Sequence, residues 1–217
     1  MIKAVLLDFD GTILDSMGTI HETLNILLKR HGLPEVDAEA LGGMAGLPLI
    51  EILPGLIPGI DAEVIDEISR EFFSVYVKIS LQRVKPVPRV EEALQSLRRR
   101  GTRLAIVTTT PRMVVERELD RFKLGKYFDQ VLTREDAPSH KPAPDVILKA
   151  LRRLRIRAEE AAVVGDSPVD IRAGKAAGVR TIGVLTGLCG LKRLVREGPD
   201  LIIDSIADLP NASLHDP

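Results

Sequence analysis

From about residue 86 onward, short apolar segments alternate with longer amphipathic ones, and this alternation limits the fold more than any other feature. The apolar segments predict strands at Leu104–Thr108, Gln130–Thr133, Ala161–Gly165, Thr181–Leu185 and Leu201–Ile203. The amphipathic segments predict helices at Val90–Arg100, Pro111–Phe122, Pro144–Leu154 and Pro168–Ala177. We therefore predict an α/β fold: a Rossmann-like, doubly wound parallel sheet with helices on both faces. Ligands bind such sheets at the carboxyl ends of the strands.

The residues at the predicted helix ends agree with this pattern. Thr110-Pro111 and Ser167-Pro168 each place an N-cap residue before a proline at the first helical position. Gly101 and Gly178 follow two of the helices and predict their C-terminal stops.

Residues 16 to about 85 break the alternation and show no strand pattern. One helix has an apolar face at Ile20, Leu24, Leu27 and Leu28, and a second has one within Val64–Val75. A stretch rich in glycine and proline, Leu41–Pro48, lies between them. We predict that residues 16–85 form an all-helical cap inserted into an α/β core of residues 1–15 and 86–217. We expect this cap to lie over the carboxyl edge of the sheet as a lid.

The composition narrows the range of partners. Lys and Arg total 30 and Asp and Glu total 31, so no basic excess favours nucleic acid or an anionic membrane surface. No apolar run is long enough to span a membrane. The only cysteine, Cys189, excludes an internal disulfide and is expected to be a small, semi-buried apolar residue rather than a nucleophile, and we expect a cytoplasmic protein. The sequence is compatible with a monomer or a homodimer.

Two aspartates follow the first apolar run. Ile2–Leu7 predicts a buried strand, and Asp8 and Asp10 lie just past its end, on the same side of an extended chain. Two close carboxylates repel each other unless a proton or a cation lies between them. Mg²⁺ suits such a site, because it binds one or two carboxylates together with a substrate phosphate. We expect Gly11 to turn the chain and to leave amides facing an anion.

The segment Asp8–Gly11 has two other interpretations. An Asp at a strand end is commonly a turn residue, and Asp-x-Asp-Gly alone is a weak signal. A calcium loop also opens with Asp-x-Asp, but it requires Asp or Asn, Gly and Glu where this chain has Thr12, Ile13 and Thr19. The calcium loop is therefore excluded.

Further polar residues follow the later strands. Thr108 comes directly after Val107 and could donate to a phosphoryl oxygen, whereas Thr110 is better explained as a helix cap. Lys141 precedes a proline, which restricts it to an extended backbone and predicts a fixed charge that neutralises phosphate.

A last acidic pair follows the strand Ala161–Gly165. Asp166 directly follows its predicted strand, as Asp8 does. This position predicts that Asp166 is a metal ligand. Asp170 has capping-box spacing from Ser167, so a helix cap and a metal contact both remain open for it.

Together these motifs resemble those of the haloacid-dehalogenase superfamily of phosphohydrolases. The matching residues are Asp8-Phe9-Asp10-Gly11-Thr12, Thr108, Lys141-Pro142 and Gly165-Asp166-Ser167-Pro168-Val169-Asp170. The resemblance extends over nearly the whole chain, and its helical insert is similar to the cap of the phosphoglycolate-phosphatase-like subfamily. Thr109 stands where relatives often have Asn, and the cap loop from Gly42 to Pro48 has no charged residue.

The resemblance implies a Mg²⁺-dependent phosphatase that acts on a small phosphorylated metabolite. Asp8 would be the nucleophile that forms an aspartyl-phosphate, and Asp10 the acid and base. Asp8, the Asp10 carbonyl and Asp166 would hold Mg²⁺, with Asp170 nearby, while Thr108 and Lys141 bind phosphoryl oxygens. It further implies that Gly11, Thr12 and Thr109 contact the substrate.

Three other functions were considered. A phosphomutase of the same architecture would pass the phosphoryl group to a sugar oxygen instead of water. A dehalogenase would need neither Mg²⁺ nor the second acid, so Asp10 argues against it. A non-enzymatic phospho-acceptor, as in receiver domains, would be shorter and would lack the cap.

Overall fold

The computed structural model describes residues 1–212 and contains a six-stranded sheet in the order β5-β4-β1-β6-β7-β8. All neighbouring strands in this sheet are parallel. The strands are β1 (Ala4–Leu7), β4 (Arg103–Val107), β5 (Gln130–Leu132), β6 (Ala161–Gly165), β7 (Arg180–Val184) and β8 (Leu201–Ile203). The predicted α/β fold with a parallel sheet is confirmed.

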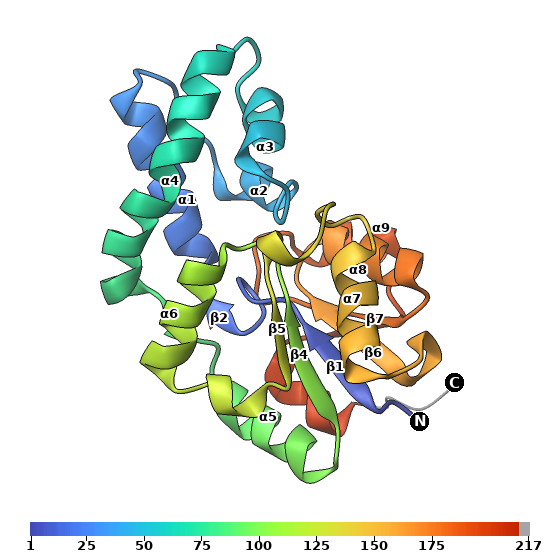
Figure 1. Cartoon of the computed structure of the whole chain (residues 1–217). Helices are drawn as coiled ribbons and strands as arrows, with labels where there is room; N and C mark the ends of the chain where they lie inside the picture. Colours follow the sequence, from blue (N-terminus) through green and yellow to red (C-terminus); the bar gives the residue numbers. More distant parts are fainter. Residues whose placement is uncertain (213–217) are drawn as a thin grey trace.

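Helices cover both faces of the sheet (Figure 1). They are α5 (Val90–Arg99), α6 (Arg112–Phe122), α7 (Asp145–Leu154), α8 (Pro168–Ala177) and α9 (Leu191–Glu197). Strand β1 shows how the faces are divided, because its side chains alternate between two apolar clusters. Val5 and Leu7 pack in the cluster that includes Val90 of α5, whereas Leu6 packs in the cluster that includes Ile147 of α7.

Four helices interrupt the α/β alternation: α1 (Met17–Arg30), α2 (Ala38–Gly42), α3 (Leu49–Leu56) and α4 (Ala62–Arg83). Figure 1 shows them gathered beyond one edge of the sheet, with α1 and α4 packed side by side. The chain leaves the core through β2 (Leu14–Asp15) and returns through β3 (Lys85–Pro86), which pair antiparallel.

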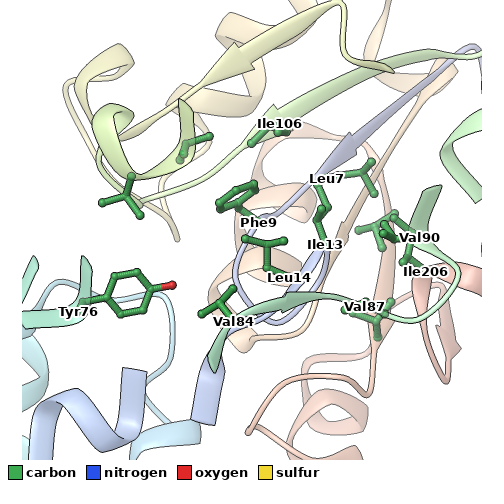
Figure 2. Packing of buried hydrophobic residues seen from close by; sticks show 14 of the residues in the cluster. Leu7, Phe9, Ile13, Leu14, Tyr76, Val84, Val87, Val90, Ile106 and Ile206 are labelled. Carbon is green, nitrogen blue, oxygen red and sulfur yellow. The ribbon is translucent and has the colours of Figure 1, made fainter. Parts of the chain in front are cut away.

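The apolar core is continuous across this junction. Figure 2 shows Phe9, Ile13 and Leu14 from the turn after β1 packed near Val84, just before β3. Because the same buried cluster also contains Leu24 of α1 and Phe72 of α4, the helical segment and the sheet share one hydrophobic core.

The helix-end predictions have mixed outcomes. Gly178 follows α8 with a φ of +71°, and the Ser167 capping box precedes this helix with Pro168 in its first turn, as predicted. The Thr110 prediction is wrong: Pro111 is the N-cap of α6, the helix starts at Arg112, and no side chain caps it. Cys189 is buried, as expected for a small core residue.

Short 3-10 helices complete the described elements, at Gly125–Tyr127, Arg134–Asp136, Ala158–Glu160 and Ile206–Asn211. Within residues 1–212, no helix combines the length and the apolar character that crossing a membrane would require.

Candidate active site

The carboxyl ends of three adjacent strands bring the predicted polar residues together. Asp8, Thr108 and Asp166 are each the first residue after their strands, β1, β4 and β6. Strand β1 lies between β4 and β6, so these residues meet at one edge of the sheet. This is the edge where ligands bind in parallel α/β sheets.

Lys141 lies at the centre of this group and is buried. Its Nζ donates to Oδ1 of Asp8 at 2.6 Å, to Oδ1 of Asp170 at 2.5 Å and to the Val107 carbonyl at 2.9 Å. These contacts use all three ammonium protons. Burial opposes the charge of Lys141, but the charges of Asp170 and Asp8 outweigh it and raise the pKa of Lys141. The residue is therefore a fixed cation beside Asp8.

Asp8 has one carboxylate oxygen, Oδ1, held by Lys141 and the other, Oδ2, without a hydrogen bond from the described residues. The side chain lines a cavity. Burial raises the pKa of Asp8 to about 7, and the Asp170 charge adds to this against the lowering effect of Lys141. A second cation nearby would favour the ionised, nucleophilic form.

Asp166 supplies the strongest indication of a metal site. Its Oδ1 accepts a 3.3 Å hydrogen bond from the Thr12 hydroxyl, but its buried Oδ2 has no hydrogen-bond partner. Backbone lies close around this carboxylate, because a Cβ added at Gly11 or Gly187 would overlap it. Burial, followed by the charges of Asp170 and Asp8, raises the pKa of Asp166. An unpartnered buried carboxylate is costly without a proton or a cation.

Carboxylate oxygens of Asp8, Asp166 and Asp170 all lie within 4.8 Å of one another. Hard oxygen ligands in this arrangement fit a divalent cation such as Mg²⁺. Lys141 neutralises only one of the three charges, so the donor set has room for a further cation.

Asp170 makes the helix-cap contact that the sequence left open beside a metal role, and also an ion pair with Lys141 that the sequence did not predict. Its Oδ2 completes the capping box of α8, accepting from the Ser167 amide at 3.1 Å and from the Ser167 hydroxyl at 2.5 Å. Its Oδ1 accepts from Lys141. Asp170 therefore holds the lysine in place from a helix terminus.

Asp10 is held separately from the Lys141 group. Its Oδ1 accepts from the Ser16 hydroxyl at 2.6 Å, and its Oδ2 accepts from the Thr110 hydroxyl at 2.5 Å. Burial raises the pKa of Asp10, although both hydrogen bonds act in the opposite direction. A raised pKa suits a group that must give and take a proton. The sequence interpretation missed Ser16 and Thr110 as partners of Asp10. Only Ser16, six positions after Asp10, is close enough in the sequence for a local signal.

The remaining predicted site residues have mostly structural partners. A φ of +77° confirms the role of Gly11 in the turn, and its own amide donates to the Leu14 carbonyl within that turn. Thr12 contacts Asp166. The Thr108 hydroxyl donates to the Thr110 hydroxyl at 3.2 Å. The Thr109 hydroxyl donates to the Gly46 carbonyl at 3.2 Å, linking the core to the helical segment.

A cavity of about 340 Å³ lies between the helical segment and these residues. Its floor includes Asp8, Asp10 and Asp166, and much of its wall is apolar. The apolar lining comes mainly from the four helices α1 to α4 and the loop between α2 and α3: Met17, Ile20, Leu24, Leu41, Leu47, Leu49, Ile50, Ile52, Phe72 and Phe73. Tyr76 of α4 also lines it, and its hydroxyl points toward the core in Figure 2.

The glycine-rich loop between α2 and α3 lies against the core. A Cβ added at Gly46 would overlap the Val169 side chain, and Arg193 of α9 donates to the Glu39 carbonyl of α2 at 3.1 Å. With the Thr109–Gly46 hydrogen bond, these contacts hold the loop over the carboxyl edge of the sheet.

The structure combines a parallel α/β sheet, acidic residues and a buried lysine at its carboxyl edge, and a helical cover. This combination fits a hydrolase of the haloacid dehalogenase-like kind. The chain belongs to the haloacid dehalogenase-like hydrolase family, whose model matches residues 5–184.

The relatives agree with this membership. A protein of Caldanaerobacter subterraneus subsp. tengcongensis, provisionally named pyrophosphatase PpaX, is 34% identical over 96% of this chain and 93% of its own. Phosphoglycolate phosphatase 1 of Pseudomonas aeruginosa is 32% identical over 95% of this chain and 78% of its own. A provisionally named haloacid dehalogenase-like hydrolase from Bacteroides fragilis has a similar structure, with a TM-score of 0.85 and 28% identity over 96% of this chain and 100% of its own.

Proposed function

We propose that this chain is a Mg²⁺-dependent phosphatase that hydrolyses a small phosphomonoester, of the phosphoglycolate kind, through an aspartyl-phosphate on Asp8. The observation that carries the proposal is the 2.6 Å contact of Asp8 with the buried Lys141, with Asp10 held apart on the same cavity floor. The relatives named as phosphatases support it. We also propose a cytoplasmic enzyme that acts as a monomer or a homodimer.

In the first half of the reaction, a carboxylate oxygen of Asp8 forms a bond to phosphorus while the bond to the leaving oxygen breaks. Asp10 gives its proton to that oxygen, and the alcohol departs. In the second half, Asp10 takes a proton from a water molecule, which attacks the phosphorus of the aspartyl-phosphate. Inorganic phosphate leaves and the Asp8 carboxylate is restored.

The fixed charges around Asp8 support this sequence of steps. Lys141 neutralises charge on the phosphoryl oxygens, and Thr108 offers a hydroxyl from the adjacent strand end. Asp8, Asp166 and the Asp10 carbonyl would hold Mg²⁺, with Asp170 beside them. The ion would supply further neutralisation of the transferring phosphoryl group.

The division of the chain fits this chemistry. We propose that residues 16–85 are a cap that excludes water from a core formed by residues 1–15 and 86–217, with β2 and β3 at the connection. Excluding water strengthens each electrostatic contact within the site. Three residues would then act at the edge of the substrate site. Gly11 would do so through its turn, Thr12 through its contact with Asp166, and Thr109 through its hydrogen bond to the cap loop.

The test is release of inorganic phosphate from a panel of small phosphorylated metabolites, measured with Mg²⁺ and with EDTA. We expect Mg²⁺-dependent turnover that Asp8→Asn abolishes while the fold stays intact. Metal-independent turnover, or full activity in Asp8→Asn, would contradict the proposal. Substrate consumed without phosphate release would favour a phosphomutase instead.

Pyrophosphate is a second candidate substrate. The 34% identical relative provisionally named a pyrophosphatase is the observation that favours it. Including pyrophosphate in the panel decides between the two, because the same Asp8 chemistry would release two phosphates from it.

A further inference from the structure

The ionisable side chains on the cavity wall are few. Beyond the acidic floor and Tyr76, the described residues that line the cavity include only Asp66 of α4, Arg134 and His140. His140 directly precedes Lys141, whereas Arg134 lies in the 3-10 helix after β5. Since the rest of the wall is largely apolar, Arg134 is the permanent cation that a substrate would meet outside the catalytic group.

Arg134 lacks an ion pair because the neighbouring acids are occupied. Glu135 accepts from the Thr133 hydroxyl at 2.7 Å and from a backbone amide at the start of α6. Asp136 completes a capping box with Thr133. Asp136 is also paired with three cations, Arg112, Lys149 and Arg153. The Arg134 charge acts on the neighbouring carboxylate, since, against the effect of burial, hydrogen bonds from Thr133 and backbone amides, together with Arg134, lower the pKa of Glu135. No salt bridge from the described part of the chain reaches the Arg134 guanidinium, so its hydrogen-bond donors can still meet a ligand.

The backbone of Arg134 is linked to Thr110, the residue whose hydroxyl contacts the proposed acid. Its amide donates to the Thr110 carbonyl at 3.4 Å, and the Thr110 hydroxyl donates to Asp10 at 2.5 Å. In the proposed reaction, Asp10 protonates the leaving oxygen. From this link through Thr110 we infer that Arg134 serves the leaving-group side of the cavity.

We propose that Arg134 is a specificity-determining residue that binds a second anionic group, a carboxylate or a phosphate, on the leaving group of the substrate. This inference rests on the proposed phosphatase function. A guanidinium matches the geometry of both anions and forms charge-assisted hydrogen bonds with them. Without Arg134, an anion on the leaving group would lose part of its hydration in the cavity with no cation to pair with in return.

The test compares two substrates that differ only at the second group. Phosphoglycolate carries a carboxylate, and 2-hydroxyethyl phosphate carries a neutral hydroxymethyl group in its place. We expect Arg134→Gln to lower the ratio of kcat/KM for phosphoglycolate to that for 2-hydroxyethyl phosphate by about tenfold or more, mainly through KM. Arg134→Lys, which keeps the charge, should recover part of the ratio.

Arg99→Gln is the matched control, because Arg99 is also exposed and has no salt bridge within residues 1–212, but lies at the end of α5 away from the cavity lining. A ratio in Arg134→Gln equal to that of the wild type would overturn the inference and leave the phosphatase proposal standing. A wild type that prefers the neutral ester would overturn it too. If the wild type hydrolyses neither ester with Mg²⁺, the proposed function itself fails and the inference with it.

Discussion

Lys141 sets the electrostatic balance of the site at the scale of single residues. It is almost fully buried and pairs with two carboxylates, Asp8 and Asp170. Removing one partner of a buried ion pair leaves an uncompensated charge, which is strongly destabilising. The Asp170 contact therefore serves folding as well as chemistry, because it keeps the lysine charged and in place beside Asp8.

Thr110 provides a prediction at this scale. Thr110→Val removes one of the two hydrogen bonds to Asp10 while keeping the shape of the side chain. A hydrogen bond to a charged group contributes about 1.5–3 kcal/mol. We expect kcat for phosphate release to fall by about tenfold or more.

The control for this prediction is Thr109→Val, which removes a neighbouring hydroxyl that contacts the Gly46 carbonyl instead of Asp10. It should affect KM more than kcat. A wild-type kcat in Thr110→Val, at unchanged thermal stability, would show that Thr110 does not position the acid.

At the scale of elements, the docked glycine-rich loop is the contact that closes the cavity. Gly46 has a φ of +87°, and an added Cβ would overlap Val169 of α8. Its carbonyl also accepts from Thr109. Both the backbone conformation and the close approach to the core require glycine at this position.

Gly46→Ala and Gly59→Ala form a matched pair that separates these two requirements. Gly59 has a similar φ of +82°, but nothing lies within 4 Å of an added Cβ there. Both substitutions should lower the free energy of unfolding by about 1–2 kcal/mol through the left-handed backbone. Only Gly46→Ala should also lower kcat/KM, by about tenfold or more, because it displaces the loop from the core.

Chemical denaturation and steady-state kinetics on the two variants measure these effects. Equal kcat/KM values for Gly46→Ala and Gly59→Ala would show that docking of the loop does not matter for turnover.

Local sequence patterns predicted the elements that have strong periodicity or clear end signals. The bounds predicted for β6, α8 and β8 match the structure. The two-residue strands β2 and β3 were missed, since a ladder that short has no pattern of its own. Helix α9 was missed too, because Leu194 is its only buried residue and gives no apolar face.

The sequence predicted the site residues that directly follow strand ends. It did not predict residues whose role depends on a contact with a distant part of the chain. Asp8 and Asp166 come directly after predicted strands, and the parallel topology then brings them together. Thr110 looked like a helix cap because Thr-Pro is a common N-terminal signal. Its actual partner, Asp10, is 100 positions away in the sequence, so no local pattern could identify the contact.

At the scale of the whole molecule, the helical segment and the sheet contribute different parts of the cavity. The sheet edge carries the charged groups, and the helices supply a mostly apolar cover for the cavity between them. The two parts share one buried cluster, which includes Phe72 of α4 and Leu7 of β1. We infer that substrate binding and exclusion of water depend on both parts together.

The central claim is that Asp8 carries the phosphoryl group, and trapping that group tests it most directly. Asp10→Asn should still be phosphorylated, though slowly because it lacks the acid for the leaving oxygen, and should hydrolyse the aspartyl-phosphate slowly because water activation needs the Asp10 carboxylate. After incubation with Mg²⁺ and a substrate from the panel, peptide mass spectrometry should find the phosphoryl group on Asp8. The Asp8→Asn/Asp10→Asn double variant should carry none. Phosphate release by Asp8→Asn at the wild-type rate, or a phosphoryl group on a different residue, would contradict the account.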